Sequence, residues 1–193
     1  MYFILSFFAG FCGMSFEIIA ARYLFPSFGS TVDTWSIIIA VFIGLSAIGN
    51  IFANHLKNLK NIEDKYIIPI LLLVWSFWVF VVSQTGWESS FFINKSIDGF
   101  ILLKTFFAAL YIFAIPCFIY GLITPLSAVY LHKGNISKTV GYLNASGSIG
   151  SIVGIIVFNQ FLSWIFTVDQ CLQISGFILI TLASYVFYKV KKI

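Results

Sequence analysis

Residues 2–24 of the chain read YFILSFFAGFCGMSFEIIAARYL, an apolar run long enough to cross a bilayer as one helix. No basic segment precedes the run, and no small-residue cleavage site follows a short apolar core. Pro26 and the turn residues Ser27 to Ser30 then interrupt the helical pattern. We therefore interpret residues 2–24 as a retained membrane span rather than as a cleaved signal peptide.

The rest of the chain has the same character. Of its 193 residues, 60% are hydrophobic and only 9% are charged, and the mean hydropathy is +1.00. A water-soluble domain could not bury so large an apolar fraction in one core. We predict an all-α integral membrane protein that forms a single domain over residues 1–193, with the lipid bilayer as its main partner.

Polar or helix-breaking stretches divide the chain into six apolar runs. The predicted transmembrane helices cover about residues 2–24, 34–53, 66–84, 99–131, 140–164 and 168–188. The fourth would be about 50 Å long as one helix, which exceeds a bilayer core. We expect it to tilt or to kink at Pro116 and Pro125, and two short spans are the alternative.

The positive charges are distributed unevenly between the two sides of the predicted bundle. One side has Arg22, Lys95 and Lys104, and the other has Lys57, Lys60, Lys65, Lys133, Lys138, Lys189, Lys191 and Lys192. The positive-inside rule then places both termini in the cytoplasm, in agreement with an even number of spans. These cations are scattered rather than gathered in a patch, so we expect no nucleic-acid partner.

Glu17 is the most informative residue because an ionised carboxylate within a span is costly unless it is paired or hydrated. Ser6, Gly10, Gly13 and Glu17 share one face of the first helix, which predicts a seam between helices. One interpretation is that Glu17 binds a cation or proton from an outward cavity. The other is a structural pair with Arg22 or a neighbouring helix, although the five-residue offset turns Arg22 roughly 140° away.

Other polar residues are predicted on the same side of the membrane as Glu17. Asn159 and Gln160 lie near the end of the fifth run, and Asp169 and Gln173 near the start of the sixth. Together they would line an outward vestibule, whereas each alone is typical of a membrane interface. The candidate ligand-binding residues are Glu17, Arg22, Asn159, Gln160 and Gln173.

Glycines recur at spacings that allow helices to approach closely. Gly150 and Gly154 form a GxxxG pair in the fifth run. We expect close helix packing at Gly10, Gly13, Gly44, Gly49, Gly141, Gly150 and Gly154. The alternative is a surface that slides or bends during a transport cycle.

Signatures of catalysis and metal binding are missing from the sequence. Cys12, Cys117 and Cys171 form no CxxC pair and have no histidine nearby, so neither a metal site nor a disulfide framework is indicated. The chain also contains no glycine-rich phosphate loop, serine triad or HExxH helix. We therefore expect no enzymatic activity and no cofactor.

Residues 13–56, GMSFEIIAARYLFPSFGSTVDTWSIIIAVFIGLSAIGNIFANHL, resemble the N-terminal membrane region of fused spermidine synthase-like proteins. The resemblance rests on Glu17 and Arg22, on residues 29–31, and on Gly44 and Gly49. Two further blocks, GLITPL at 121–126 and the glycine-rich residues 140–154, follow in the same order as in that family. The resemblance implies a bundle like half of a major facilitator, located in the bacterial inner (plasma) membrane.

The chain also departs from that family. Asn54-His55 replaces the usual Gly-Arg, and Tyr142, Asn144 and Gly147 replace the usual Arg, Tyr and Asn. The sequence stops at residues 189–193, where the family's aminopropyltransferase domain would begin. The resemblance therefore implies a membrane module without that catalytic domain.

Two functions follow from the residues and the resemblance. The first is a transporter-like module for a small cation or polyamine, working as a homodimer. The second is a non-transporting membrane anchor that docks a separate soluble aminopropyltransferase-like enzyme through Lys57, Lys60 and Lys133.

Overall fold

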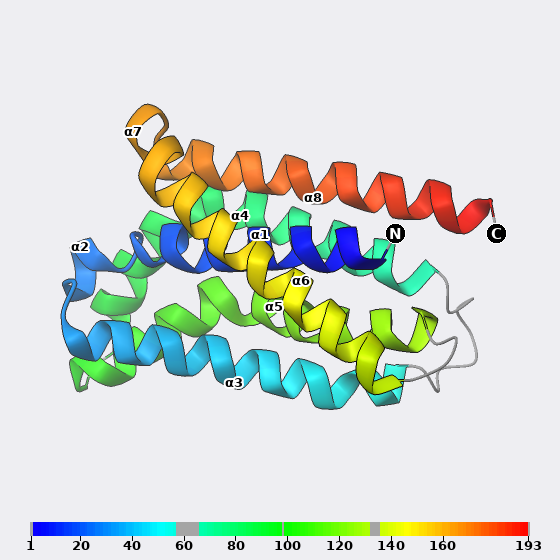
Figure 1. Ribbon diagram of the computed structural model, residues 1–193. Helices are drawn as coiled ribbons and strands as arrows, with labels where there is room; N and C mark the ends of the chain where they lie inside the picture. The colour runs from blue at the N-terminus through cyan, green and yellow to red at the C-terminus, as the bar shows by residue number, and fades with distance from the viewer. Residues whose placement is uncertain (1, 57–65, 98, 132–135, 193) are drawn as a thin grey trace.

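A computed structural model describes residues 2–56, 66–97, 99–131 and 136–192 of the chain (Figure 1). These residues form an all-α bundle, as predicted. Its long helices are α1 (Tyr2–Ala21), α3 (Val32–Leu56), α4 (Ile67–Ser96), α5 (Ile101–Leu131), α6 (Ile136–Ile156) and α8 (Val168–Lys191). The shorter elements are α2 (Phe25–Phe28), the π-helix η2 (Val157–Leu162) and α7 (Ser163–Ile165).

The prediction of six spans is confirmed. Within the described residues, six helical segments are long and apolar enough to cross a membrane, with η2 and α7 continuing the segment that α6 begins. Both termini lie at one end of the bundle, which we call the terminus end, and α2 and α7 lie at the opposite end (Figure 1). This arrangement agrees with an even number of crossings.

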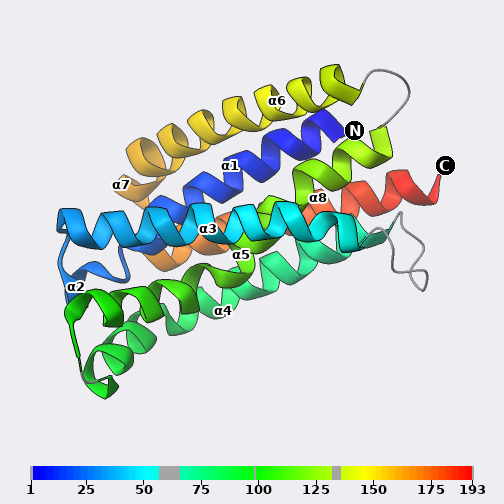
Figure 2. The ribbon, with the colours of Figure 1, turned by 90° about the horizontal axis from the view of Figure 1, so that it is seen from below.

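Helix α1 lies inside the bundle. It packs against α5, α6 and α8, while α3 pairs with α5 and α4 pairs with both α5 and α8 (Figure 2). Of the α1 span, 67% is buried within the chain, compared with 28% of the α3 span and 17% of the span that contains α6. Helices α3 and α6 therefore present most of their surface to lipid or to another molecule.

Small residues bring the backbones of α1 and α6 into contact. A Cβ atom added at Gly150 would collide with the carbonyl oxygen of Phe7, and one at Gly154 with that of Phe11. Hydroxyl groups add hydrogen bonds across the same seam. The Ser6 Oγ donates to the Leu143 carbonyl oxygen, at 2.8 Å. Glycine spacing and hydroxyl bonding thus combine to hold α6 against α1, as small-residue seams do in membranes.

Glycines also bring the backbones of α3 and α5 into contact. A Cβ at Gly49 would collide with the Phe118 carbonyl oxygen, and one at Gly121 with the Ser46 carbonyl oxygen. By contrast, among the described residues no side chain and no backbone of another helix lies within 4 Å of the Cβ position of Gly44 or Gly141. The described part of the chain therefore makes no close helix contact at these two glycines, which lie on exposed faces of their helices.

Most helix ends lie within about four residues of the predicted ones, and the largest departure is at the end of α4. Helix α4 continues past Gln84 to Ser96 because its serines satisfy their hydroxyl groups within the helix, as Ser90 Oγ does by donating to the Gly86 carbonyl oxygen at 2.8 Å. At the far end of α6, the helix widens into η2 before Ser163. Polar residues in an apolar run therefore do not mark helix ends here.

The fourth span is one helix rather than two short ones. Helix α5 is continuous from Ile101 to Leu131 with Pro116 and Pro125 inside it. Figure 2 shows that the ribbon of α5 changes direction along its length. A proline inside a helix removes one backbone hydrogen bond and favours such a bend.

Leucine at Gly150 should destabilise the bundle because its side chain would occupy the space of the Phe7 backbone. Overpacking of this kind costs about 1–3 kcal/mol, so the midpoint of thermal unfolding in detergent should fall by roughly 2–12 °C. Gly44→Leu is the matched control because its Cβ enters open space. Equal midpoints for Gly150→Leu and the wild type would contradict the described α1–α6 contact.

Candidate functional site

Glu17 lies in the last two turns of α1, with only 8% of its surface exposed. It is on the face of α1 that also carries Gly13, one turn earlier. At Gly13 this face of α1 meets α5, since a Cβ added there would lie 2.9 Å from the Tyr120 ring. No hydrogen bond joins the Glu17 carboxylate to another residue within the described ranges.

Tyr120 of α5 packs against α1 one turn before Glu17 and was not among the candidates predicted from sequence. A Cβ at Gly13 would lie 2.9 Å from the Tyr120 ring, so the ring covers α1 where it has no side chain. The centroid of the Tyr120 ring is 6.3 Å from that of Trp75 and 5.7 Å from that of Phe42. Tyr120 therefore packs against α1, α3 and α4.

A polar groove of about 470 Å³ runs from Tyr120 between α3, α5 and α6. Its lining residues come from these three helices: Ser46, Asn50, Tyr120, Gly121, Thr124, Pro125, Ala128, Val140 and Asn144. Asn50 is in the last two turns of α3 and Asn144 is in the third turn of α6. The groove therefore occupies the half of the bundle at the terminus end, and Tyr120 is part of its lining.

Arg22 does not pair with Glu17. Its Nη2 donates to the Oδ1 of Asn159, at 2.8 Å. Asn159 belongs to the π-helix η2, and its carbonyl oxygen accepts from Ser163 Oγ at 2.6 Å. Single π-helical turns inside α-helices occur frequently at functional sites. Here the π-helical turn carries Asn159, which binds Arg22. The pattern of apolar residues did not predict this π-helical turn.

A second polar contact lies at the same end of the bundle. The hydroxyl of Tyr23, which is fully buried, donates to the Oδ1 of Asp169 at 2.5 Å. The Tyr23 ring packs edge-on against Trp87, with centroids 4.9 Å apart, and lies over Gly86. Burial and the neighbouring Asp169 carboxylate both raise the pKa of Tyr23 above its usual value. Tyr23 thus joins the end of α1 to α4 and α8.

The remaining predicted site residues do not gather around Glu17. Gln160 is exposed on η2, and Gln173 is half-buried on α8. Asn159 and Asp169 are engaged by Arg22 and Tyr23. The structure therefore uses Asn159 and Asp169 as contacts between helices, and it does not bring the predicted vestibule residues together around Glu17.

Some of the sequence-based interpretation concerns residues outside the described ranges. These are the loop lysines proposed to dock a soluble enzyme: Lys57, Lys60 and Lys133. Among the residues that the structure does describe, no three His, Cys, Asp or Glu side chains are grouped closely enough to hold a metal ion.

Comparison with known proteins identifies no family for this chain. No protein-family model matches it, and no curated protein and no solved structure is significantly similar to it. The described residues form six apolar helical segments that are long enough to cross a membrane.

Removing the Tyr23 hydroxyl should destabilise the protein at neutral pH, because a hydrogen bond to a charged group contributes about 1.5–3 kcal/mol. The raised pKa means that the folded state holds this proton more tightly than the unfolded state. The wild type should therefore lose this stabilisation as the pH rises above about 10, and the difference from Tyr23→Phe should shrink.

Thermal unfolding of both proteins from pH 7 to pH 11 measures this effect. Tyr142→Phe is the control because Tyr142 is an exposed tyrosine on α6. A difference between wild type and Tyr23→Phe that stays constant across this range would contradict the proposed role of the hydroxyl.

Proposed function

We propose that the protein is a transporter-like, non-enzymatic membrane module that binds a small organic cation such as a polyamine. The observation that carries the proposal is the buried carboxylate of Glu17, which no described side chain neutralises or hydrogen-bonds. A carboxylate at membrane depth that has no protein partner favours a cationic ligand or a proton as its counter-charge. Arg22, the nearest candidate in sequence, is bonded to Asn159 instead.

Aromatic rings near the Glu17 face of α1 suit an organic cation better than a bare proton. The Tyr120 ring covers Gly13, one turn before Glu17, and Trp75 and Phe42 lie next to that ring. Aromatic faces attract alkylammonium groups through cation–π interactions. Carboxylate and rings together match the two features of a polyamine, which are its positive charge and its apolar methylene segments.

The polar groove offers a route to this position from the terminus end. Side-chain hydroxyl and amide groups of Ser46, Asn50, Thr124 and Asn144 line it. Such groups can replace water around a cation that leaves the aqueous phase. The resemblance of residues 13–56 to the membrane region of spermidine synthase-like proteins independently suggests a polyamine among small cations.

A second copy of the chain is the proposed partner that closes the groove. The groove lies between α3 and α6, the two spans that are least buried within the chain. Asn144 and Ser148 are exposed on α6, and Asn50 is exposed on α3. Polar side chains are unfavourable against lipid tails and serve better at a helix interface or beside a water-filled cavity. A homodimer would provide a helix interface and a water-filled cavity for these polar side chains.

Glu17→Gln should abolish binding of radiolabelled spermidine and putrescine to the purified protein, because the amide removes the charge and keeps the shape. Equilibrium dialysis of the wild type and the variant measures the effect. Glu88→Gln is the control, since Glu88 is an exposed acidic residue of α4. Equal polyamine binding by the wild type and Glu17→Gln would contradict the assignment of Glu17 to the site. No polyamine binding by either protein would favour the membrane-anchor function.

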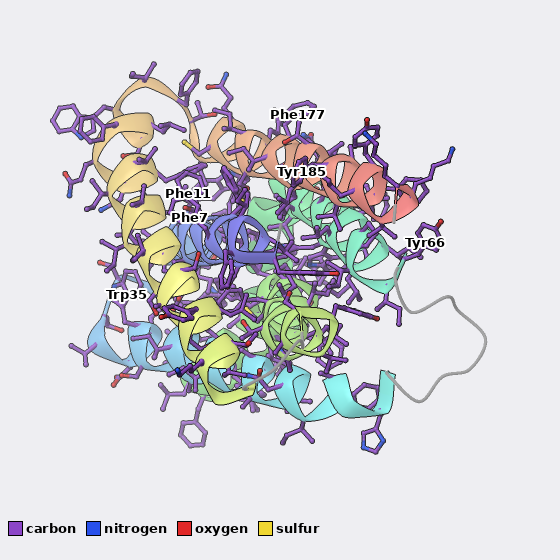
Figure 3. All side chains as sticks on the ribbon, turned by 45° about the vertical axis from the view of Figure 1, so that its right-hand side comes forward. Phe7, Phe11, Trp35, Tyr66, Phe177 and Tyr185 are labelled. Carbon is purple, nitrogen blue, oxygen red and sulfur yellow. The ribbon has the colours of Figure 1, made fainter. Side chains whose placement is uncertain are left out.

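The homodimer can be tested by cysteine cross-linking in membranes. Asn144→Cys should form cross-linked dimers with a short bifunctional thiol reagent because Asn144 lines the open groove. Phe177→Cys is the control, since Figure 3 places Phe177 on the outer side of α8, away from the groove. The native cysteines are buried and should contribute little. Equal cross-linking at both positions would argue against an interface at the groove.

A further inference from the structure

A second concave site lies at the terminus end of the bundle, between α4 and α8. It is a groove of about 340 Å³ whose apolar wall includes Pro69 and Leu73 of α4 and Phe187 of α8. Its polar lining comes from Ser184, Tyr188 and Lys191, all on α8. The groove therefore has an apolar wall that follows two helices and a cation where α8 ends.

The cationic end of this groove continues into a neighbouring hollow. That hollow, of about 320 Å³, is lined by Tyr188, Lys191 and Lys192, so the two share Tyr188 and Lys191. The Nζ of Lys192 lies 5.8 Å from the centroid of the Tyr188 ring. Among the residues that the structure describes, no acidic side chain lines either hollow. The described lining is therefore positively charged.

The position of these residues along the helices separates charge from apolar surface. Lys191 is the last residue of α8, whereas Phe187 is one turn nearer the middle of the span. Leu73 lies in the second turn of α4, past Pro69. The lysines therefore sit at the membrane surface, and the apolar wall runs from there into the hydrocarbon region.

We propose that this groove binds an anionic phospholipid of the leaflet next to the two termini. The phosphate of the headgroup lies between Lys191 and Lys192, and one acyl chain follows Leu73 and Phe187. Basic pockets between helices at a membrane surface recognise anionic headgroups in this way. A zwitterionic lipid would bring no net negative charge to the two lysines.

This lipid site is independent of the proposed transport function. It uses α4 and α8, whereas the polar groove lies between α3, α5 and α6. Neither Glu17 nor Tyr120 lines it. Failure of polyamine binding would leave this proposal intact, and failure of lipid binding would leave the Glu17 site intact.

The test uses the full chain purified in an uncharged detergent. Native mass spectrometry measures binding of added phosphatidylglycerol and phosphatidylcholine, and glycerol phosphate serves as a headgroup without acyl chains. The double variant Lys191→Gln with Lys192→Gln should bind phosphatidylglycerol roughly 30-fold more weakly. Lys138→Gln is the matched control because Lys138 is an exposed lysine at the start of α6, at the same end of the bundle.

A second variant tests the apolar wall without changing charge. Ser184 is an exposed residue that lines the groove, so Ser184→Trp should fill the acyl-chain path and weaken phosphatidylglycerol binding while both lysines remain. Circular dichroism and gel filtration check that each variant is folded.

Three results would overturn the proposal. The first is equal binding of phosphatidylcholine and phosphatidylglycerol. The second is an equal loss of binding in Lys138→Gln and in the double variant. The third is glycerol phosphate binding as tightly as phosphatidylglycerol, which would make the site one for a free phosphate ester rather than for a lipid.

Discussion

The close approach of α1 and α6 is the contact on which the rest of the bundle depends. In lipid, apolar side chains gain little by leaving the solvent, so helices associate through packing and internal hydrogen bonds. Gly150 and Gly154 let α6 lie against the α1 backbone, and Ser6 adds a hydrogen bond across the seam. With this face of α1 held against α6, Gly13 meets the ring of Tyr120, and Glu17 one turn later lies inside the bundle.

The two ends of the bundle differ in a way that bears on access to Glu17. At the end opposite the termini, Arg22 binds Asn159 and Tyr23 binds Asp169, which ties α1 to η2 and α8. At the terminus end, a polar groove lies open between α3 and α6 and reaches Tyr120. The proposed route for a ligand therefore begins at the terminus end, whereas the sequence suggested a vestibule at the opposite end. Two of the residues that suggested it, Asn159 and Asp169, accept hydrogen bonds from Arg22 and Tyr23 instead.

Sequence reasoning identified the apolar helices and Glu17 and had difficulty where polar residues occur within a helix. Serines in α4 predicted a loop after Gln84, yet they bond to their own helix, and α4 continues to Ser96. The π-helical turn around Asn159 could not be recognised from the apolar pattern, because a π-helix differs from an α-helix in backbone hydrogen bonding and not in amino-acid composition. Tyr120 was overlooked for a related reason: one tyrosine in a run of apolar residues differs little from a lipid-facing aromatic until its neighbours are known.

The sequence by itself determined that this chain is an apolar all-α protein with six spans, because runs of that length and hydropathy can satisfy their backbone groups in lipid only as helices. It also marked Glu17 as a carboxylate that should avoid lipid. Only the tertiary structure decided what surrounds that carboxylate. Helical periodicity assigns a residue to a face but does not say which helix covers that face. The packing of α1 against α5 and α6 placed the Tyr120 ring over Gly13, one turn before Glu17, and Arg22 binds Asn159.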